Sequence, residues 1–348
     1  MKAALFYRAY ESLKIEDVAT PKISENDLLV SVKTCSLCHS DIQFIDHGLA
    51  PGKTPPLILG HEIAGDVTKI GSKVKSFKIG DRVIIPASKS CGKCLACKSW
   101  NETQCDQFQL LGNDIDGGLA EYIKIDCNSP ILLPYEYSYE LGSLISNDFV
   151  GAYHVVFDRV NIHEGETVVI FGSGAYGLSI LQMAKMKKAK VYMVDIFDWK
   201  LEIAKKYGAD GVLNSNKVNV CEEALIDEVH GKADVIIDTI GVTRTLTQAM
   251  NALRKGGKLV LSGFSENSIP FLVKRLILNE ISLIGTIGAP KRKIFNIMQY
   301  IQDDRIQWKE MITNRLPLEK VNEGIDLLRM QRSIKTMIYP NGMEKTTK

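Results

Sequence analysis

The chain has 348 residues, which is enough for two domains of ordinary size. Hydrophobic residues make up 45% of it and charged residues 24%, so a large buried core is expected. A formal net charge of +2 argues against nucleic acid as a partner, and no apolar run is long enough to predict a membrane span.

The first predicted elements are short strands. Apolar runs broken by Gly, Pro and Asp continue to about Tyr153 and predict strands at 28–32, 63–67 and 82–85. The apolar run at the N-terminus is too short for a signal peptide, since a charge follows it at Arg8. We therefore expect a β-rich domain whose loops carry metal ligands.

Two loops of this region carry residues suited to a catalytic metal. Cys38 offers a thiolate and His61 an imidazole, and both suit zinc. A free cysteine or a lone histidine is common without any metal, but Asp41 can orient the ring of His61, as carboxylates beside metal sites do. Ser40 adds a hydroxyl through which a substrate proton can leave. Together these residues predict a zinc site.

A dense cysteine cluster follows. The spacing Cys91-x2-Cys94-x2-Cys97-x7-Cys105 supplies four thiolates, which close a tetrahedral zinc site and so predict a structural metal. An iron–sulfur cluster is the alternative, but ferredoxin spacing brings the fourth cysteine sooner with a proline next, and here Asp106 follows. Clustered cysteines without an export signal also favour metal over disulfides and predict a reducing, cytoplasmic compartment.

From Thr167 onward the sequence alternates between strands and helices, which predicts a doubly wound parallel sheet. The residues after about 290 are too few for a third domain and are expected to pack on the first one. The predicted domains are residues 1–153 with 291–348, and residues 154–290. The expected strands are 167–171, 190–194, 234–238, 257–261 and 281–284, and helices are expected at 178–187 and 199–207.

A glycine-rich loop joins the first strand of this region to its first helix. The segment fits G-x-G-x-x-G in the context that a dinucleotide site requires, between a buried strand and a helix. The three glycines allow a tight turn, close approach of the pyrophosphate and close helix packing, and the helix N-terminus offers free N–H groups to the phosphates. The cofactor-binding residues predicted here are Gly172, Gly174, Ala175, Tyr176 and Gly177.

An acidic residue ends the second strand of the same region. Asp195 can accept hydrogen bonds from both ribose hydroxyls of NAD, and it repels the 2′-phosphate of NADP. No arginine follows it directly, and Lys200 is near enough in sequence to touch the ribose edge. NAD is therefore expected rather than NADP.

These motifs, in this order, resemble the medium-chain zinc-containing alcohol dehydrogenases over nearly the whole chain. The similarity extends to segments 57–62, 80–83 and 116–122. It implies a GroES-like catalytic domain and a Rossmann domain, bound NAD, one catalytic and one structural zinc per chain, and a homodimer or homotetramer.

The resemblance also implies roles for single residues. Cys38 and His61 would bind the catalytic zinc, Glu62 would be an outer or exchanging ligand, and Ser40 would take the alcohol proton. Two further positions match residues that approach the cofactor pyrophosphate, His39 and Lys335.

Two departures from the family pattern concern the catalytic site. The third zinc ligand of the family, a Cys, Glu or Asp, falls seven residues before His154, where this chain has Asn147 with Asp148 beside it. An amide oxygen is a weak neutral ligand, so Glu62 is expected to carry a larger share of zinc binding. Direct coordination by Asn147, or by Asp148, stays open. Many members also have a histidine relay where this chain has Gln43, which cannot titrate.

The expected reaction is reversible oxidation of an alcohol to an aldehyde or ketone with NAD. The resemblance places Ala87 and Ser88 in the substrate pocket, and their small size favours secondary, cyclic or aryl alcohols over ethanol. The alternatives are a zinc- and NAD-binding protein with impaired catalysis, a polyol or hydroxyacyl dehydrogenase of the same family, and a zinc-independent quinone reductase-like enzyme. The remaining histidines and cysteines are expected to be structural or surface residues: His47, His154, His163, His230, Cys35, Cys127 and Cys221.

Overall fold

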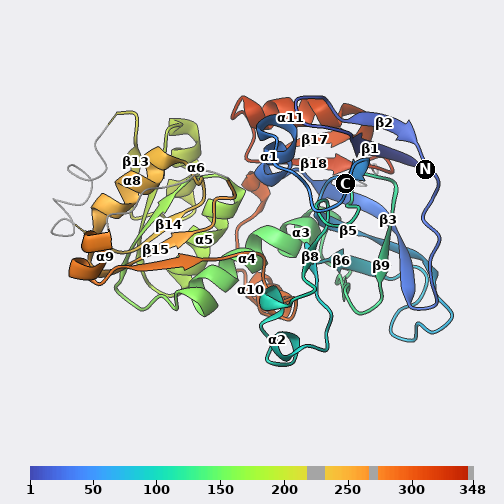
Figure 1. Cartoon of the computed structure of the whole chain (residues 1–348), viewed down its shortest axis with the longest axis horizontal. Helices are drawn as coiled ribbons and strands as arrows, with labels where there is room; N and C mark the ends of the chain where they lie inside the picture. The colour runs from blue at the N-terminus through green and yellow to red at the C-terminus, as the bar shows by residue number, and fades with distance from the viewer. Residues whose placement is uncertain (218–231, 266–272, 344–348) are drawn as a thin grey trace. The chain divides into compact units, whose positions relative to one another are not determined.

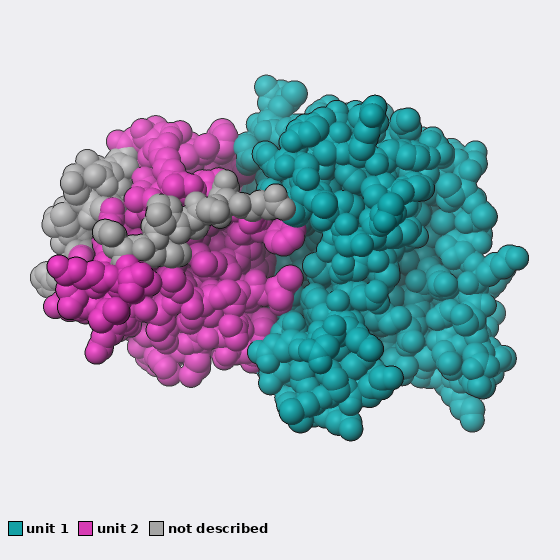
Figure 2. Space-filling model, viewed as in Figure 1, with its two compact units in different colours: residues 1–150, 288–299, 308–348 teal, residues 151–287, 300–307 magenta. Residues whose placement is uncertain are grey.

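The computed structural model describes residues 1–217, 232–265 and 273–343 (Figure 1). Internal contacts divide the chain into two compact units (Figure 2). Unit 1 comprises Met1–Val150, Gly288–Gln299 and Trp308–Lys348, and unit 2 comprises Gly151–Ile287 and Tyr300–Gln307.

These units differ slightly from the domain boundaries expected from the sequence. The junctions lie three residues earlier than expected, and Tyr300–Gln307 belongs to unit 2 rather than to the first domain. The physical reason is local: Gln182 of unit 2 donates to the carbonyl of Gln307 at 3.0 Å, and the ring of Tyr300 lies 6.2 Å from that of Tyr153.

Unit 1 is built on mainly antiparallel sheets, in which β17 and β18 pair in parallel. Its largest sheet has the order β10-β6-β5-β3-β18-β17, with β9 also paired to β3, and a second sheet has the order β2-β1-β4. Because β18 pairs with β3, the C-terminal segment is part of this unit. The strands are β1 (Lys2–Phe6), β2 (Lys14–Asp17), β3 (Asp27–Ser36), β4 (Leu57–Ile58), β5 (Glu62–Ile70), β6 (Arg82–Ile85), β7 (Ser88–Lys89), β8 (Gln109–Leu110), β9 (Tyr122–Asp126), β10 (Ile131–Leu132), β17 (Ile312–Pro317) and β18 (Lys335–Tyr339).

Short helices connect these strands, and one helical segment continues into unit 2. That segment contains α3, a π-helical turn at Ile145–Phe149, α4, and a second π-helical turn at His154–Arg159. The helices are α1 (His39–His47), α2 (Leu95–Lys98), α3 (Tyr139–Leu144), α4 (Val150–Tyr153), α10 (Lys293–Gln302) and α11 (Val321–Arg329), with 3-10 turns at Glu102–Gln104, Lys309–Met311 and Leu318–Lys320.

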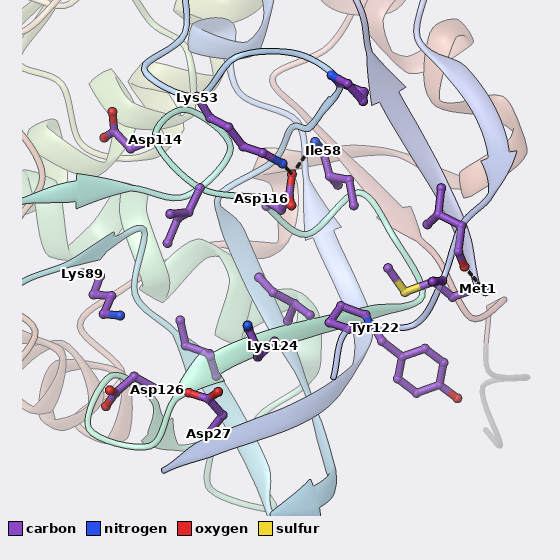
Figure 3. Close-up of a pocket in the computed structure, with 18 of the residues that line it drawn as sticks. Met1, Asp27, Lys53, Ile58, Lys89, Asp114, Asp116, Tyr122, Lys124 and Asp126 are labelled. Atoms are coloured by element: carbon purple, nitrogen blue, oxygen red, sulfur yellow. Dashed lines mark hydrogen bonds and ion pairs between the residues drawn. The ribbon is translucent and has the colours of Figure 1, made fainter. Parts of the chain in front are cut away.

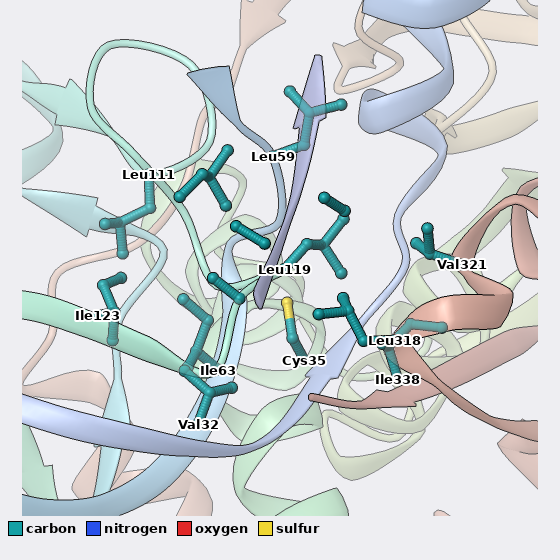
Figure 4. Close-up of a cluster of buried hydrophobic side chains, with 14 of the residues drawn as sticks. Val32, Cys35, Leu59, Ile63, Leu111, Leu119, Ile123, Leu318, Val321 and Ile338 are labelled. Atoms are coloured by element: carbon teal, nitrogen blue, oxygen red, sulfur yellow. The ribbon is translucent and has the colours of Figure 1, made fainter. Parts of the chain in front are cut away.

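The core of unit 1 gathers apolar side chains from segments far apart in sequence. Figure 4 shows Val32 and Cys35 of β3 together with Leu119, Val321 of α11 and Ile338 of β18. Cys35 is fully buried in this cluster, which confirms the structural role expected for it.

Unit 2 contains a six-stranded parallel sheet, as the βα alternation predicts. The order β13-β12-β11-β14-β15-β16 is the 3-2-1-4-5-6 order of a doubly wound dinucleotide-binding fold. Central β11 is buried along its whole length, which explains its uninterrupted apolar sequence. The elements are β11 (Thr167–Phe171), α5 (Ala175–Met186), β12 (Lys190–Asp195), α6 (Asp198–Lys206), β13 (Gly211–Asn214), β14 (Ala233–Asp238), α8 (Thr243–Ala252), β15 (Leu253–Leu261), α9 (Val273–Asn279) and β16 (Ser282–Gly285).

Most expected elements of unit 2 occur with shifted ends. Helix α5 begins three residues before the expected start because Gly174 already caps it, and β15 begins at Leu253 rather than Gly257. Cys221 and His230 lie outside the described residues. Among the described helices, none is both long and apolar enough to cross a membrane.

Candidate functional site

Three side chains of unit 1 bring potential metal ligands together. A sulfur of Cys38, a ring nitrogen of His61 and a carboxylate oxygen of Glu62 all lie within 4.8 Å of one another. Cys38 caps α1 just after β3, Glu62 is the first residue of β5, and His61 directly precedes that strand. Since Ser36 of β3 pairs with Glu62 of β5, the antiparallel register itself brings the two loops side by side.

The turn before His61 requires a glycine. Gly60 has a φ of 90°, and a Cβ there would lie 2.7 Å from the sulfur of buried Cys35. Asp41 holds the other side of the ring: its Oδ2 accepts the N–H of Cys38 at 2.9 Å, and its Oδ1 lies 3.9 Å from Nδ1 of His61. This arrangement leaves Nε2 of His61 as the nitrogen available to a metal.

Glu62 is completely buried and is held by three donors. The hydroxyl of Ser36 donates to Oε2, Nδ2 of Asn147 donates to Oε1 at 2.9 Å, and Nζ of Lys335 donates to both oxygens at 2.9 and 2.7 Å. Burial alone raises the pKa of Glu62, but the positive charges of Lys335 and His61 outweigh burial, so the pKa is lowered. The carboxylate is therefore charged inside the protein.

Lys335 does not have the surface position expected of a residue that binds pyrophosphate. It is 2% exposed, and its ammonium also lies 2.7 Å from Oδ2 of buried Asp148. It lies in β18, which pairs with β3 inside unit 1, and two carboxylates neutralise its charge. Its expected role toward the cofactor pyrophosphate stays a prediction. Asp148 likewise faces Lys335 and does not join the three clustered ligands.

The structure also places the other residues that the sequence analysis considered around the metal. The hydroxyl of Ser40 is buried and has no hydrogen-bond partner in the part of the chain that the structure describes. Asn147 is half-buried in the first π-helical turn, a feature that recurs at functional sites. The N–H of Ala87 donates to the carbonyl of Ser146 at 3.4 Å, so the residues expected to line the substrate pocket adjoin this turn. His154 has a partner that the sequence did not suggest, Asp158 at 3.0 Å.

The four-cysteine segment brings its sulfurs together as a metal site would. The ligand sulfurs of Cys91, Cys94, Cys97 and Cys105 all lie within 4.8 Å of one another. Backbone N–H groups point at them, including that of Cys94 toward the sulfur of Cys91 at 3.3 Å. Such donors, at Lys93 and Cys94, lower the pKa of Cys91 to about 6. Four convergent sulfurs complete a tetrahedral ligand set and fit a closed structural zinc site.

In unit 2 the glycine loop has the geometry of a phosphate-binding turn. Gly172 has a φ of 102°, and a Cβ there would lie 2.3 Å from the hydroxyl of Thr239. A Cβ at Gly177 would lie 1.8 Å from the carbonyl oxygen of Gly172, so the helix could not pack as closely with any other residue. At Gly174 a Cβ would meet no atom within 4 Å, so the space before α5 is open to a phosphate.

The neighbouring strand end carries the acid expected to select the cofactor. Oδ2 of Asp195 accepts the N–H of Ser173 at 2.8 Å, which ties the loop to β12, and Oδ1 accepts the N–H of Ile196 at 2.7 Å. The ammonium of Lys200 lies 5.4 Å from the ring centre of Phe197. Its burial lowers the pKa of Lys200, against the effect of the negative charge of Asp195. In contrast, His39 is exposed on the first turn of α1.

Comparison with known proteins gives the family. The family model described as "Alcohol dehydrogenase GroES-like domain" matches residues 24–135, and the one described as "Zinc-binding dehydrogenase" matches residues 175–303. A sorbitol dehydrogenase of Bacillus subtilis is 32% identical over 98% of both chains. The chain belongs to the zinc-containing medium-chain dehydrogenases.

Two further relatives agree with this assignment. An alcohol dehydrogenase of Geobacillus stearothermophilus is 33% identical over 94% of this dehydrogenase and 95% of its own length. The structure of the alcohol dehydrogenase of the archaeon Aeropyrum pernix matches with a TM-score of 0.89 at 25% identity, over 98% of this chain and all of that one. The coarse activity of the chain is therefore that of an alcohol or polyol oxidoreductase.

The dehydrogenase also has a surface hollow that is separate from these sites. Figure 3 shows it on unit 1, lined by residues of β9 such as Tyr122 and Lys124 and by Asp114 and Asp116. Its lining includes none of the expected metal or cofactor residues, and Lys53 on its rim is already paired with Asp116 at 2.5 Å. The chemistry is therefore assigned to the clustered ligands and not to this hollow.

Proposed function

We propose that this dehydrogenase uses NAD and a zinc ion to oxidise a secondary alcohol or polyol reversibly to a ketone. The observation that carries the proposal is the convergence of Cys38, His61 and Glu62 in unit 1. The open glycine loop at the end of a parallel sheet in unit 2 supports it. The thiolate, imidazole and carboxylate fit zinc, which takes three protein ligands and one open position at catalytic sites.

The residues around the metal have distinct tasks. A bound zinc would act as a Lewis acid that lowers the pKa of the alcohol. Asp41 lies 3.9 Å from the ring of His61 and would orient it. The buried hydroxyl of Ser40, which has no hydrogen-bond partner among the described residues, would take the alcohol proton while it releases its own proton toward bulk water. Asn147 lies beside Glu62 as a weak ligand or a contact through water.

The cofactor site supplies orientation. Gly172, Gly174 and Gly177 bring the backbone and the N-terminus of α5 to the pyrophosphate, with Ala175 and Tyr176 in the first turn. Asp195 would accept hydrogen bonds from the ribose hydroxyls, with Lys200 at the ribose edge, and the family resemblance assigns His39 to the phosphates. Bound NAD would supply the nicotinamide that takes up the hydride.

Two observations favour a secondary alcohol as substrate. A relative of nearly full length carries the name sorbitol dehydrogenase, and most carbinols of sorbitol are secondary. Ala87 and Ser88, beside the turn that holds Asn147, leave volume near the reacting carbon. We also propose a homodimer or homotetramer, and a reducing cytoplasmic location, which clustered unpaired thiols favour.

The test is a zinc count joined to an alcohol panel. We expect about two zinc ions per chain, about one in the Cys38→Ser variant, and higher kcat/KM for sorbitol or other secondary alcohols with NAD than for ethanol. A protein with two zinc ions and no NAD-dependent turnover above the Cys38→Ser level would contradict the proposed activity. Ethanol as the best substrate would contradict the substrate class alone.

A further inference from the structure

The buried ammonium of Lys335 has two carboxylate partners, and this pairing bears on the metal site. Lys335 lies 2.7 Å from Oε2 of Glu62 and 2.7 Å from Oδ2 of Asp148. All three side chains are at most 3% exposed, so water does not screen these charges. One of the two carboxylates, Glu62, is also within reach of Cys38 and His61.

A buried lysine with a single acidic partner would hold that acid in place. Removing one partner of a buried ion pair leaves an uncompensated charge, which is strongly destabilising. Lys335 would then oppose any movement of Glu62 toward a metal. Because Asp148 pairs with the same ammonium, Glu62 can turn toward Cys38 and His61 while Lys335 stays paired.

The charge balance points the same way. Along the contacts that run from the metal through Glu62 and Lys335 to Asp148, the charges are +2 for zinc, −1 each for thiolate Cys38, Glu62 and Asp148, and +1 for Lys335, which sum to zero. Asp41, on the other side of His61, is the same in every variant compared below. Asn147 contributes no charge at the position where related dehydrogenases are expected to have an acidic ligand or a thiolate. Without Asp148 the same buried group would carry a net charge of +1, and a buried net charge is costly.

We propose that Asp148 is a positioning residue for the catalytic zinc: it holds Lys335 and thereby leaves Glu62 free to bind the metal. Asp148 thus supplies, through Lys335, the negative charge that Asn147 lacks. The inference rests on the proposed function, since it requires a zinc ion at Cys38 and His61.

The test compares zinc retention in charge-matched variants of the full chain. In Asp148→Asn the zinc site gains a net positive charge, so a chelator should remove the Cys38-dependent zinc on the order of 10- to 100-fold faster. In the double variant Asp148→Asn with Lys335→Met, the charge sum returns to zero and the ion pair between Lys335 and Glu62 is gone, so that only the hydrogen bonds from Ser36 and Asn147 to Glu62 remain. Retention should therefore recover toward the wild-type rate. Glu140 lies in α3 of the same helical segment as Asp148 and is paired with Arg315. The control variant Glu140→Gln removes this acid and should leave zinc retention unchanged.

The visible spectrum of cobalt(II) bound in place of zinc reports which residues coordinate the metal, and a loss of stability alone would not change it. Wild type and the double variant should share one visible spectrum, and Asp148→Asn should differ, because Glu62 no longer coordinates. The zinc of the four-cysteine segment serves as an internal standard for folding. Wild-type retention and spectrum in Asp148→Asn, or a double variant no better than the single one, would overturn the proposal. If the wild-type zinc content did not depend on Cys38, the proposed metal site itself would be wrong.

Discussion

We expect the carboxylate of Asp195 to set the preference for NAD over NADP. It lies at the end of β12, 9% exposed, with its oxygens directed at the glycine loop and the following turn. A 2′-phosphate beside this charge should cost more than about 1.4 kcal/mol, so kcat/KM with NAD should exceed that with NADP by well over tenfold. Asp195→Asn should narrow the ratio, whereas Asp198→Asn, which removes an exposed acid on α6, should not. Equal kcat/KM values for the two cofactors in wild type would refute this assignment.

Glu62 and Asn147 can be separated by mild chelation. With Glu62 as third ligand, Glu62→Gln should lose the catalytic zinc on the order of 10- to 100-fold faster than wild type, and Asn147→Ala should lose it only slightly faster. The zinc remaining after timed exposure to a chelator measures this, with Cys38→Ser as the baseline. The opposite ranking would identify the asparagine as the true ligand.

Zinc affinity at the catalytic site should rise with pH because of His61. In the metal-free protein, burial lowers the pKa of His61. The hydrogen bond and charge of Cys38, with the charges of Asp41 and Glu62, outweigh burial and raise the pKa to about 10. Below that pH the ring holds a proton that zinc must displace, so apparent affinity should increase about tenfold per pH unit. Competition with a chromophoric chelator at about pH 6, 7 and 8 tests this prediction. A zinc affinity that does not change over that pH range would contradict it.

At the scale of elements, the four-cysteine segment should act on stability and not on chemistry. Its short helix α2 and the 3-10 turn at Glu102–Gln104 have little apolar core of their own, so a bound zinc supplies their folding energy. Cys94→Ser should lower the melting temperature or the soluble yield. The kcat of the enzyme that folds should stay within about twofold of wild type.

A control substitution in the same segment tests whether the loss of stability depends on the sulfur of Cys94. Ser99→Ala, at the end of α2, removes a hydroxyl and no sulfur, so it should keep both zinc ions and the wild-type melting temperature. A Cys94→Ser protein that is fully stable and still holds two zinc ions would show that the segment is not a zinc site.

At the scale of the whole molecule, unit 2 carries an apolar surface that a second copy would cover. Val273, Ile277 and Leu278 of α9 are 66%, 68% and 63% exposed. Strand β16, which ends the sheet among the described residues, exposes Leu283. An apolar patch beside an open sheet edge favours association.

We therefore expect a homo-oligomer that weakens when a charge enters this patch. Ile277→Lys should shift the protein toward monomer in size-exclusion chromatography with light scattering. Ile79→Lys, a change at a similarly exposed apolar residue of unit 1, should not. An unchanged mass for Ile277→Lys would place the interface elsewhere.

Features that depend on residues close together in the chain could be predicted from the amino-acid sequence. The uninterrupted apolar run of β11, the glycine loop and the spaced cysteines depend on neighbours within a few residues, and periodicity and spacing record them directly. The pair of Cys38 and His61 was recognisable from residue chemistry and the family resemblance, and the register of β3 with β5 explains why they meet.

The surroundings of the metal ligands, in contrast, depend on contacts between distant parts of the chain. Lys335 is 273 residues from Glu62 in sequence, and the pairing of β18 with β3 brings it inside unit 1. The family resemblance implied that it approaches the pyrophosphate, and nothing in its neighbouring residues indicated burial, since lysines are usually exposed. Asp148, the second carboxylate paired with Lys335, lies in a π-helical turn. The extra residue of such a turn directs side chains away from the positions they take in a regular α-helix. Burial and the pairing of charges across sheets depend on long-range contacts, which no local pattern records.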